Sequence, residues 1–197
     1  MSRNSKIILG SIGGLLLITI IWFISAGNSM VRKNQAIEKL WSDVEASYQR
    51  RLDLYDAIVS TIKGSTEFEQ NTLTNVIAAR NAAHIPVDAK NLTPEAIQQF
   101  QNAQASYRSA INVVLEQYPQ IQTTQQFRDF QENQAGTENR INKARTDFNT
   151  AVQDFNSTIL TWPNSIVAGM KGLKEHGYFK ADEGADKAPK IDFSSGK

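Results

Sequence analysis

The sequence predicts an all-α fold, in which an N-terminal transmembrane helix is followed by an elongated antiparallel bundle of three long helices, with or without a fourth short helix. One observation behind this prediction is an uncharged apolar run close to the N-terminus. A second is that apolar residues recur at steps of three and four in long segments, which is the spacing of one helix face. A third is that prolines stand at the ends of these segments and not inside them, as helices require.

Length and composition limit the function classes before any motif is considered. A chain of 197 residues is enough for one domain with a real core and too short for two large ones. The net charge is +1, so no overall field would attract nucleic acid, and we expect no nucleic-acid partner. The chain has no cysteine, which excludes disulfides and thiolate metal sites. We predict no cofactor and no bound metal.

The apolar segment, residues 7–26, carries no charge. A helix of this length is about 30 Å long, which is the thickness of the hydrocarbon core of a bilayer. The apolar region of a secretory signal peptide is shorter and precedes a small-residue cleavage site, for which the sequence SAG at 25–27 is a poor match. The segment is therefore interpreted as an uncleaved transmembrane helix in preference to a cleaved signal.

Positive charges flank the apolar segment on both sides. Arg3, Lys6 and the terminal amine precede it, and Arg32 and Lys33 follow it. The positive-inside rule favours a cytoplasmic N-terminus and a domain on the outside, by a difference of one charge.

The first helix of the bundle is predicted from Val31 to about Ala83, with Gly64 as the position where it could bend. Asn28 or Ser29 could cap it as a new helix, or the apolar segment could continue into it without a break. Its buried stripe, interrupted by one arginine, is predicted to consist of Ile37, Trp41, Val44, Tyr48, Arg51, Tyr55, Ile58 and Ile62.

The second helix begins with a strong start signal, since Thr93 can act as N-cap and Pro94 suits the first helical position. Pro119 stops or kinks it. The spacing of its apolar and polar side chains predicts a buried face made of Ile97, Phe100, Gln104, Tyr107, Ile111, Val114 and Tyr118.

The third helix is predicted to start near Thr123 or Thr124 and to end by Pro163. Residues 164–173 suit one short further helix, and residues 174–197 form a tail that is expected to be partly ordered. The buried stripe of the third helix is predicted to be Phe127, Phe130, Gln134, Thr137, Ile141, Ala144, Phe148, Val152, Phe155 and Ile159.

The triplet Asp-Phe-Asn occurs twice in the third helix, seven residues apart. Phe148 and Phe155 therefore fall on the same buried stripe, and Asn149 and Asn156 lie at its edge. Each asparagine could bond a neighbouring element across the seam and help to fix its register, or it could be a solvated amide. The triplet therefore recurs because the same face of the helix returns after seven residues.

A catalytic or metal site needs convergent groups, and the sequence offers few. His84 and His176 have no partner at a metal-binding spacing. Arg51 lies on an apolar stripe, where a charge is costly unless it is paired. We hypothesise that Glu138 pairs with it across the bundle; alternatively, the arginine stem lies on the seam and its head reaches water. Arg145 lies near the seam one heptad after Glu138.

Several segments together resemble the LemA family of bacterial membrane proteins. Single departures, such as Tyr55-Asp56 where the family more often has Ile-Pro, leave the resemblance intact. The segments that carry it are LWSDVEASYQRRLDLYDAIVSTIKG at 40–64, NVIAARNAA at 75–83, YPQIQTTQQFRDFQENQAGTENRINKARTDFNTAVQDFN at 118–156 and WPNSIVAG at 162–169.

The resemblance implies a single-span membrane protein with a helical domain and no established enzymatic activity. The expected division of the chain is a short N-terminal segment (1–6), a transmembrane helix (7–26), a LemA-like helical bundle (27–173) and the tail (174–197). The expected location is the bacterial inner membrane, with the N-terminus in the cytoplasm and the domain outside.

The function predicted from these observations is that of a membrane-anchored, non-enzymatic scaffold that associates through its helices with itself or with a partner protein. The alternative is a ligand- or lipid-binding domain, or a cryptic enzyme, that uses Arg, Glu and Asn groups inside the bundle. The expected partners are the lipid bilayer and either further copies of the chain or another protein. The candidate seam and interaction residues are Trp41, Arg50, Arg51, Asp53, Glu138, Arg145, Asn149 and Asn156.

Overall fold

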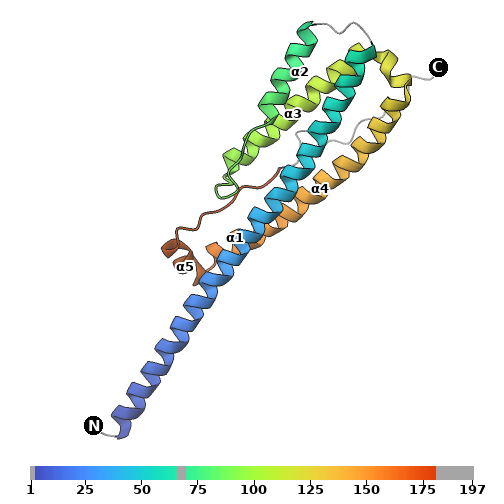
Figure 1. Ribbon diagram of the computed structural model, residues 1–197. Helices are drawn as coiled ribbons and strands as arrows, with labels where there is room; N and C mark the ends of the chain where they lie inside the picture. The colour runs from blue at the N-terminus through green and yellow to red at the C-terminus, as the bar shows by residue number, and fades with distance from the viewer. Residues whose placement is uncertain (1–2, 66–69, 181–197) are drawn as a thin grey trace, which may run out of the picture.

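The computed structural model describes residues 3–65 and 70–180 and is helical throughout this part of the chain, apart from short connections. The predicted all-α fold is confirmed, with helices that run up and down beside one another (Figure 1). The elements are α1 (Arg3–Ser65), α2 (Gln70–Ala83), α3 (Pro94–Gln117), the short 3-10 helix η1 (Pro119–Thr123), α4 (Gln125–Leu160) and α5 (Asn164–Met170).

Helix α1 is a single helix of 63 residues. Its N-terminal part projects alone beyond the bundle, and its C-terminal part is one of the bundle helices (Figure 1). The apolar segment is long and apolar enough to cross a membrane, and none of its most apolar stretch is buried in the protein. No new helix begins at Asn28 or Ser29, because α1 passes through both residues without a break. Of the two possibilities left open by the sequence, the apolar segment therefore continues into the bundle.

The prediction of one helix from Val31 to Ala83 is wrong. Helix α1 ends at Ser65, and α2 begins at Gln70 and runs back along α3 (Figure 1). Gly64 weakens the helix at this point. A straight continuation would also leave Val76 and Ala83 without a partner, whereas in the folded chain both are buried against the far end of the bundle.

The predicted starts of the other two long helices are confirmed. The Thr93 hydroxyl accepts a hydrogen bond of 3.2 Å from the Ala96 N–H at the start of α3. The Thr124 hydroxyl accepts one of 3.2 Å from the Phe127 N–H at the start of α4. Both side chains satisfy N–H groups that have no partner inside the helix.

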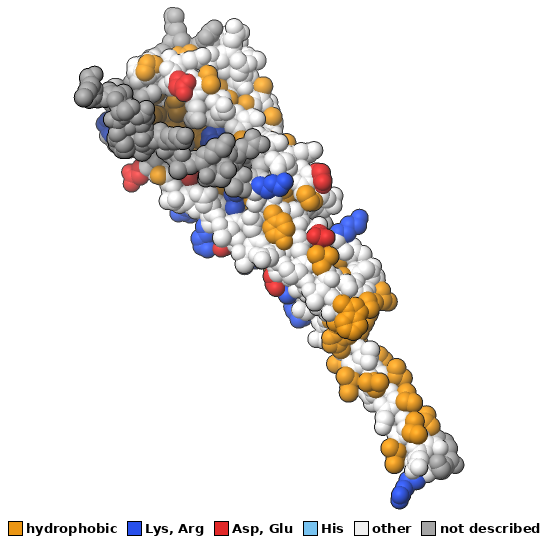
Figure 2. Space-filling view, turned by 180° about the vertical axis from the view of Figure 1, so that it is seen from behind, with side chains coloured by type: hydrophobic (Ala, Val, Ile, Leu, Met, Phe, Trp, Pro, Cys, Tyr) orange, Lys and Arg blue, Asp and Glu red, His pale blue; other side chains and the backbone are white. Residues whose placement is uncertain are grey.

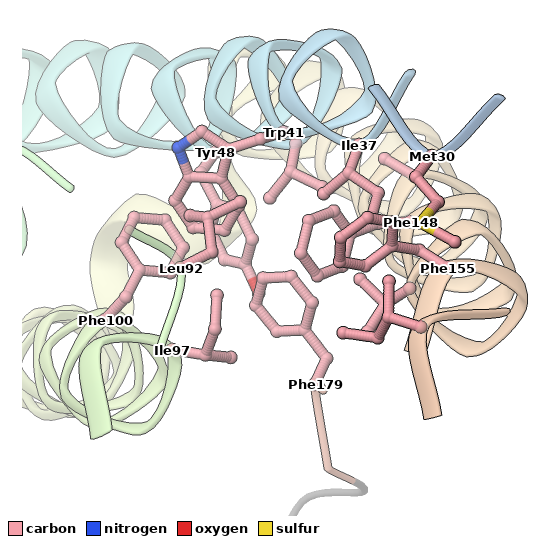
Figure 3. Packing of buried hydrophobic residues seen from close by; sticks show 14 of the residues in the cluster. Met30, Ile37, Trp41, Tyr48, Leu92, Ile97, Phe100, Phe148, Phe155 and Phe179 are labelled. Carbon is pink, nitrogen blue, oxygen red and sulfur yellow. The ribbon is translucent and has the colours of Figure 1, made fainter. Parts of the chain in front are cut away.

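The C-terminal part of α1 packs along α4, and the predicted stripes face the core. The buried apolar side chains form two clusters. The near cluster, next to the apolar segment, is centred on Trp41, Phe100, Phe148, Phe155 and Phe179 (Figure 3). The far cluster, at the other end of the bundle, contains Leu52, Tyr55, Ile58, Ile62, Val76, Tyr107, Ile111, Phe127 and Phe130.

Candidate functional site

A polar layer separates the two clusters. It consists of Arg51 on α1, Gln104 on α3 and Glu138 on α4, and the first two are almost completely buried. Arg51 Nη1 lies 3.3 Å from Glu138 Oε1, and Arg51 Nη2 donates to Gln104 Oε1 over 3.1 Å. The ion pair hypothesised from the sequence is therefore present. One buried arginine joins three helices at the middle of the bundle.

Gln104 extends the polar layer to α2. Its amide nitrogen donates 2.8 Å to the carbonyl oxygen of Ala83, the last residue of α2. The last carbonyls of a helix have no N–H donor inside the helix, so the Gln104 amide supplies a donor to one of them. The short helix α2 is thus fixed to the same layer as Arg51.

A half-open cavity of about 160 Å³ lies over the polar layer. Arg51, Arg108 and Arg145 line it with Glu138, so three positive charges stand against one negative charge. Among the described residues, the buried Nε of Arg51 has no hydrogen-bond acceptor. An excess of guanidinium groups in a recess is suited to a small anion, because carboxylate and phosphate oxygens match the planar fork of arginine.

A second feature is the C-terminal segment, residues 173–180, which runs without regular structure between α3 and α4. The Asn156 amide donates 2.9 Å to the His176 carbonyl and its oxygen accepts 3.0 Å from the His176 N–H. Asn149 binds Phe179 in the same way, at 2.8 and 2.9 Å. The asparagines at the edge of the stripe are therefore not solvated amides. Each side-chain amide donates to and accepts from the backbone of one residue of the segment, as a neighbouring β-strand would.

A third amide repeats this arrangement from the opposite helix. Gln101 on α3 donates 3.0 Å to the Lys180 carbonyl, and its oxygen accepts 3.2 Å from the Lys180 N–H. Arg145 donates 2.6 Å to the same carbonyl. These three pairings, called the amide pairs below, satisfy the backbone of a segment that has no sheet or helix of its own.

Phe179 places the C-terminal segment in the core. Its ring stacks on Trp41 at 5.9 Å between centroids and meets Phe148 edge to face at 5.4 Å (Figure 3). Gly177 permits the close approach, because a Cβ at that position would lie 2.6 Å from the Pro94 Cα. The Gly177 N–H donates 2.8 Å to the Leu92 carbonyl. The segment is therefore part of the folded bundle as far as Lys180.

His176 is buried in the same segment. Its Nε2 lies 2.7 Å from Asn34 Oδ1, and its ring is 5.1 Å from that of Phe155. Burial lowers the pKa of His176, while the Glu38 carboxylate and a backbone hydrogen bond with Leu92 act in the opposite direction. The neutral imidazole is the favoured form in the folded chain.

Most of the candidate residues from the sequence lie in these two features. Trp41 is in the near cluster, Arg51 and Glu138 are in the polar layer, and Arg145, Asn149 and Asn156 hold the C-terminal segment. The other two of the eight, Arg50 and Asp53, lie outside the polar layer, the C-terminal segment and the near cluster, and are exposed on the outer face of α1.

Sequence reasoning missed the residues that complete each feature. Gln104 and Gln101 were not singled out, although Gln104 stands on the predicted buried face, where a polar side chain signals a partner. Asp56 was noted only as a departure from the family pattern. It accepts hydrogen bonds from Tyr107 over 3.0 Å and from Arg80 over 2.7 Å, so it joins α1 to both α2 and α3.

Within residues 3–65 and 70–180, no three His, Cys, Asp or Glu side chains are grouped so as to hold a metal ion. His84 is exposed just after α2, far from the buried His176 in the C-terminal segment. The polar groups described above hold helices and backbone together.

Comparison with known proteins finds a matching family and several similar bacterial proteins. A model described as the LemA family matches residues 40–193. Protein LemA of Metamycoplasma hominis is 27% identical over 172 residues, which cover 86% of this chain and 76% of that protein. Magnetosome protein MamQ 2 of Paramagnetospirillum magneticum is 33% identical over 73 residues, which cover 37% of this chain and 27% of that protein. MamQ of Magnetospirillum gryphiswaldense is 29% identical over 73 residues, again 27% of its own length.

Proposed function

Because this chain belongs to the LemA family, we propose that it is a membrane-anchored, non-enzymatic scaffold whose bundle associates with further copies or with a partner protein. Residues 7–26 are the anchor, and the bundle extends from residue 27 to at least Lys180. The anchor lies in the bacterial inner membrane, with the N-terminus in the cytoplasm and the bundle outside.

The observation that carries the proposal is the continuity of α1. A helix of 63 residues is about 95 Å long, and it contains both the apolar segment and the central helix of the bundle. No loop separates the two parts, so the bundle is held at a fixed direction from its anchor. A rigid projection from a membrane suits a protein that presents a surface to other proteins better than one that must close around a substrate.

The size of the solubilised protein tests this function. The full chain is extracted in mild detergent, and its mass is measured by light scattering after subtraction of the detergent. A mass of two or more 22.0 kDa copies, or a defined complex with a second protein, is expected. A single copy at every concentration, together with no cross-linked product in native membranes, would contradict the scaffold role.

A second candidate function is the binding of a small anion in the cavity over the polar layer. The observation that favours it is the lining of the cavity, in which Arg51 lies with two further arginines and one glutamate. An anion between Arg51 and Arg108 would accept hydrogen bonds from both guanidinium groups.

Thermal unfolding of the full chain in detergent, with increasing inorganic phosphate or acetate, tests the anion site. The unfolding midpoint should rise with the anion in the natural chain and in the Arg50→Ala variant, whose arginine is exposed on the outer face of α1. It should not rise in Arg108→Ala. An equal rise in all three proteins would indicate a general salt effect and exclude the site.

A further inference from the structure

An exposed apolar surface covers the corner between α4 and α5. Leu160, the last residue of α4, and Trp162, in the turn that follows, are 59% and 77% exposed, and Ile166 and Met170 on α5 are 56% and 72% exposed. These four residues, called the corner surface, lie within residues 160–170, where the chain turns from α4 into α5. Large apolar side chains grouped in this way on a protein surface usually mark a contact with a partner or a membrane.

The corner surface lies beside the point where α1 leaves the bundle. Helix α5 packs on α1, and the Lys171 stem lies so close to Gly27 that a Cβ there would overlap it. Phe23 and Ala26 lie near the C-terminal end of the apolar segment. They pack on the near cluster, which includes Val167 and Ala168 of α5. Figure 2 shows hydrophobic side chains gathered at this end of the bundle, next to the emerging helix.

The position of α5 along α1 therefore matches the end of the apolar segment. If residues 7–26 fill the hydrocarbon core, Gly27 and α5 stand at the level of the lipid headgroups. Helix α5 has the two faces that this level requires. Val167 and Ala168 point into the bundle, whereas Ile166 and Met170, four residues apart, point away from it.

The residue types of the corner also fit a lipid boundary. Tryptophan is enriched where the hydrocarbon core meets the headgroups, since its ring is apolar and its N–H is polar. Lys171, which contacts α1 at Gly27, and Arg32 on α1 are exposed cations close to the end of the apolar segment, at the height of lipid phosphates. A surface with apolar side chains directed away from the bundle and basic residues at its edge is chemically complementary to an anionic phospholipid surface.

We propose that the corner surface is a second membrane contact, in which Trp162, Ile166 and Met170 enter the boundary between headgroups and acyl chains beside the transmembrane part of α1. The proposal rests on the membrane anchoring proposed above. With one helix alone, anchor and bundle together would be free to tilt relative to the membrane and to rotate about the helix axis. A second contact beside it fixes both, so that the far end of the bundle is presented in one orientation.

The absence of cysteine from the chain allows a direct test with single labels. Met170→Cys, Leu16→Cys and Val113→Cys are each made in the full chain and labelled with an environment-sensitive fluorophore. All three side chains are exposed, so the labels do not disturb the core. Leu16 lies in the apolar segment, and Val113 is a matched apolar residue on α3, at the far half of the bundle. The labelled proteins are reconstituted in vesicles of phosphatidylcholine and phosphatidylglycerol.

The three positions should differ in a defined way. The label at Met170 should shift its emission to shorter wavelength and lose intensity to a nitroxide on the lipid headgroup more than to one deep in the acyl chain. The label at Leu16 should respond most to the deep nitroxide, and the label at Val113 to neither. Dilution of the protein in lipid should leave the Met170 signal unchanged.

Each failure has a separate meaning. If Met170 behaves like Val113 while Leu16 is quenched, the corner surface does not touch lipid and the anchoring stands. If the blue shift at Met170 disappears as the protein is diluted in lipid, the corner surface is covered by a second copy, and the inference is overturned. If Leu16 is not quenched by the deep nitroxide, the anchoring itself is wrong.

Discussion

The near half of the bundle and the far half are held together by different kinds of contact. In the near half, three aromatic rings, from α3, α4 and the C-terminal segment, meet around Trp41, and the amide pairs bind the backbone of the C-terminal segment. In the far half, aliphatic and aromatic residues pack between helices, and the partly exposed Asp56 links α1 to Tyr107 and Arg80.

The difference has a consequence for local stability. A segment from the end of the chain closes the near half, so that half cannot open without breaking buried bidentate hydrogen bonds. The helix α2 packs mainly on α3, and its tie to α1 runs through a half-exposed ion pair. Local opening should therefore begin in the far half, at α2, while the near half keeps its amide protons longest.

The largest effect is expected from Phe179→Ala, which removes the ring that the C-terminal segment places in the near cluster. Truncation of a buried phenylalanine lowers the free energy of unfolding by about 3–5 kcal/mol. Denaturant unfolding of the full chain in detergent, followed by circular dichroism, measures it. Tyr178→Ala is the control, since the neighbouring ring is 41% exposed and its hydroxyl accepts one hydrogen bond of 3.3 Å from the Asn156 amide, so its loss should have a smaller effect. If Phe179→Ala lowers the free energy of unfolding as little as Tyr178→Ala does, the segment is not part of the core.

The next largest effect is expected from Arg51→Ala, which breaks the polar layer between the halves. The loss should be about 3 kcal/mol, the low end for breaking a buried pair, because Glu138 keeps 29% of its side chain exposed and can turn to water. Arg51→Met should lose less, as an apolar side chain of similar length fills the space.

The adjacent Arg50 is the control for the polar layer, because Arg50→Ala on the exposed face should change stability by less than about 0.5 kcal/mol. A double-mutant cycle between Arg51 and Glu138 gives the pair's coupling energy. A coupling energy of zero would show that the ion pair contributes nothing to stability.

Asn156→Ala should remove both hydrogen bonds to His176 and lower the free energy of unfolding by about 1–3 kcal/mol. Hydrogen exchange then distinguishes this variant from a general loss of stability. The backbone amides of His176 and Phe179 should exchange faster, while those of the far half stay as they were. Asn133→Ala is the control, because that amide is exposed on α4 and bonds only within its own helix.

Tyr107→Phe tests the far half by removing the hydrogen bond to Asp56. Burial and the neighbouring Asp56 carboxylate both raise the pKa of Tyr107, so the phenol is a neutral donor at all ordinary pH values. The loss should be about 1 kcal/mol, the usual net contribution of one hydrogen bond. Faster exchange confined to α2 and α3 is expected. Faster exchange in the C-terminal segment would contradict the separation of the two halves.

The smallest effect is a pH dependence of the near half. Burial lowers the pKa of His176 below its ordinary value of 6.5, so the unfolded chain binds more protons than the folded chain between the two pKa values. The contribution of neutral His176 to the free energy of unfolding is complete above the pKa of the unfolded chain. It is lost as the pH falls through the lower pKa of the folded chain. The denaturation midpoint should fall on acidification in the natural chain and in His84→Gln, and fall less in His176→Gln. An identical slope in all three would show that His176 has no part in it.

The sequence was informative wherever the fold depends on a repeating pattern. The helical stripes follow from periodicity, and the caps at Thr93 and Thr124 follow from helix start signals. The cost of a buried charge led to the Arg51–Glu138 pair as one of two alternatives, and it is the one that the structure has. The end of α1 at Ser65 was missed because one glycine does not distinguish a bend from a reversal of the chain. Residues 174–197 were expected to be partly ordered, but the place of the C-terminal segment in the bundle was not predicted because the segment has no period. Its place is set by Asn149 and Asn156, whose partners are backbone groups that any residue carries.

The central claim is that α1 is one helix that anchors the bundle in a membrane, and fractionation of the full chain in a bacterium tests it most directly. Membranes are washed at alkaline pH, which removes proteins held only at the surface, and the mass of the retained protein is measured. The intact 22.0 kDa chain should stay with the lipid. Recovery of the bundle in the aqueous fraction, or a retained mass that lacks residues 1–26, would contradict the account.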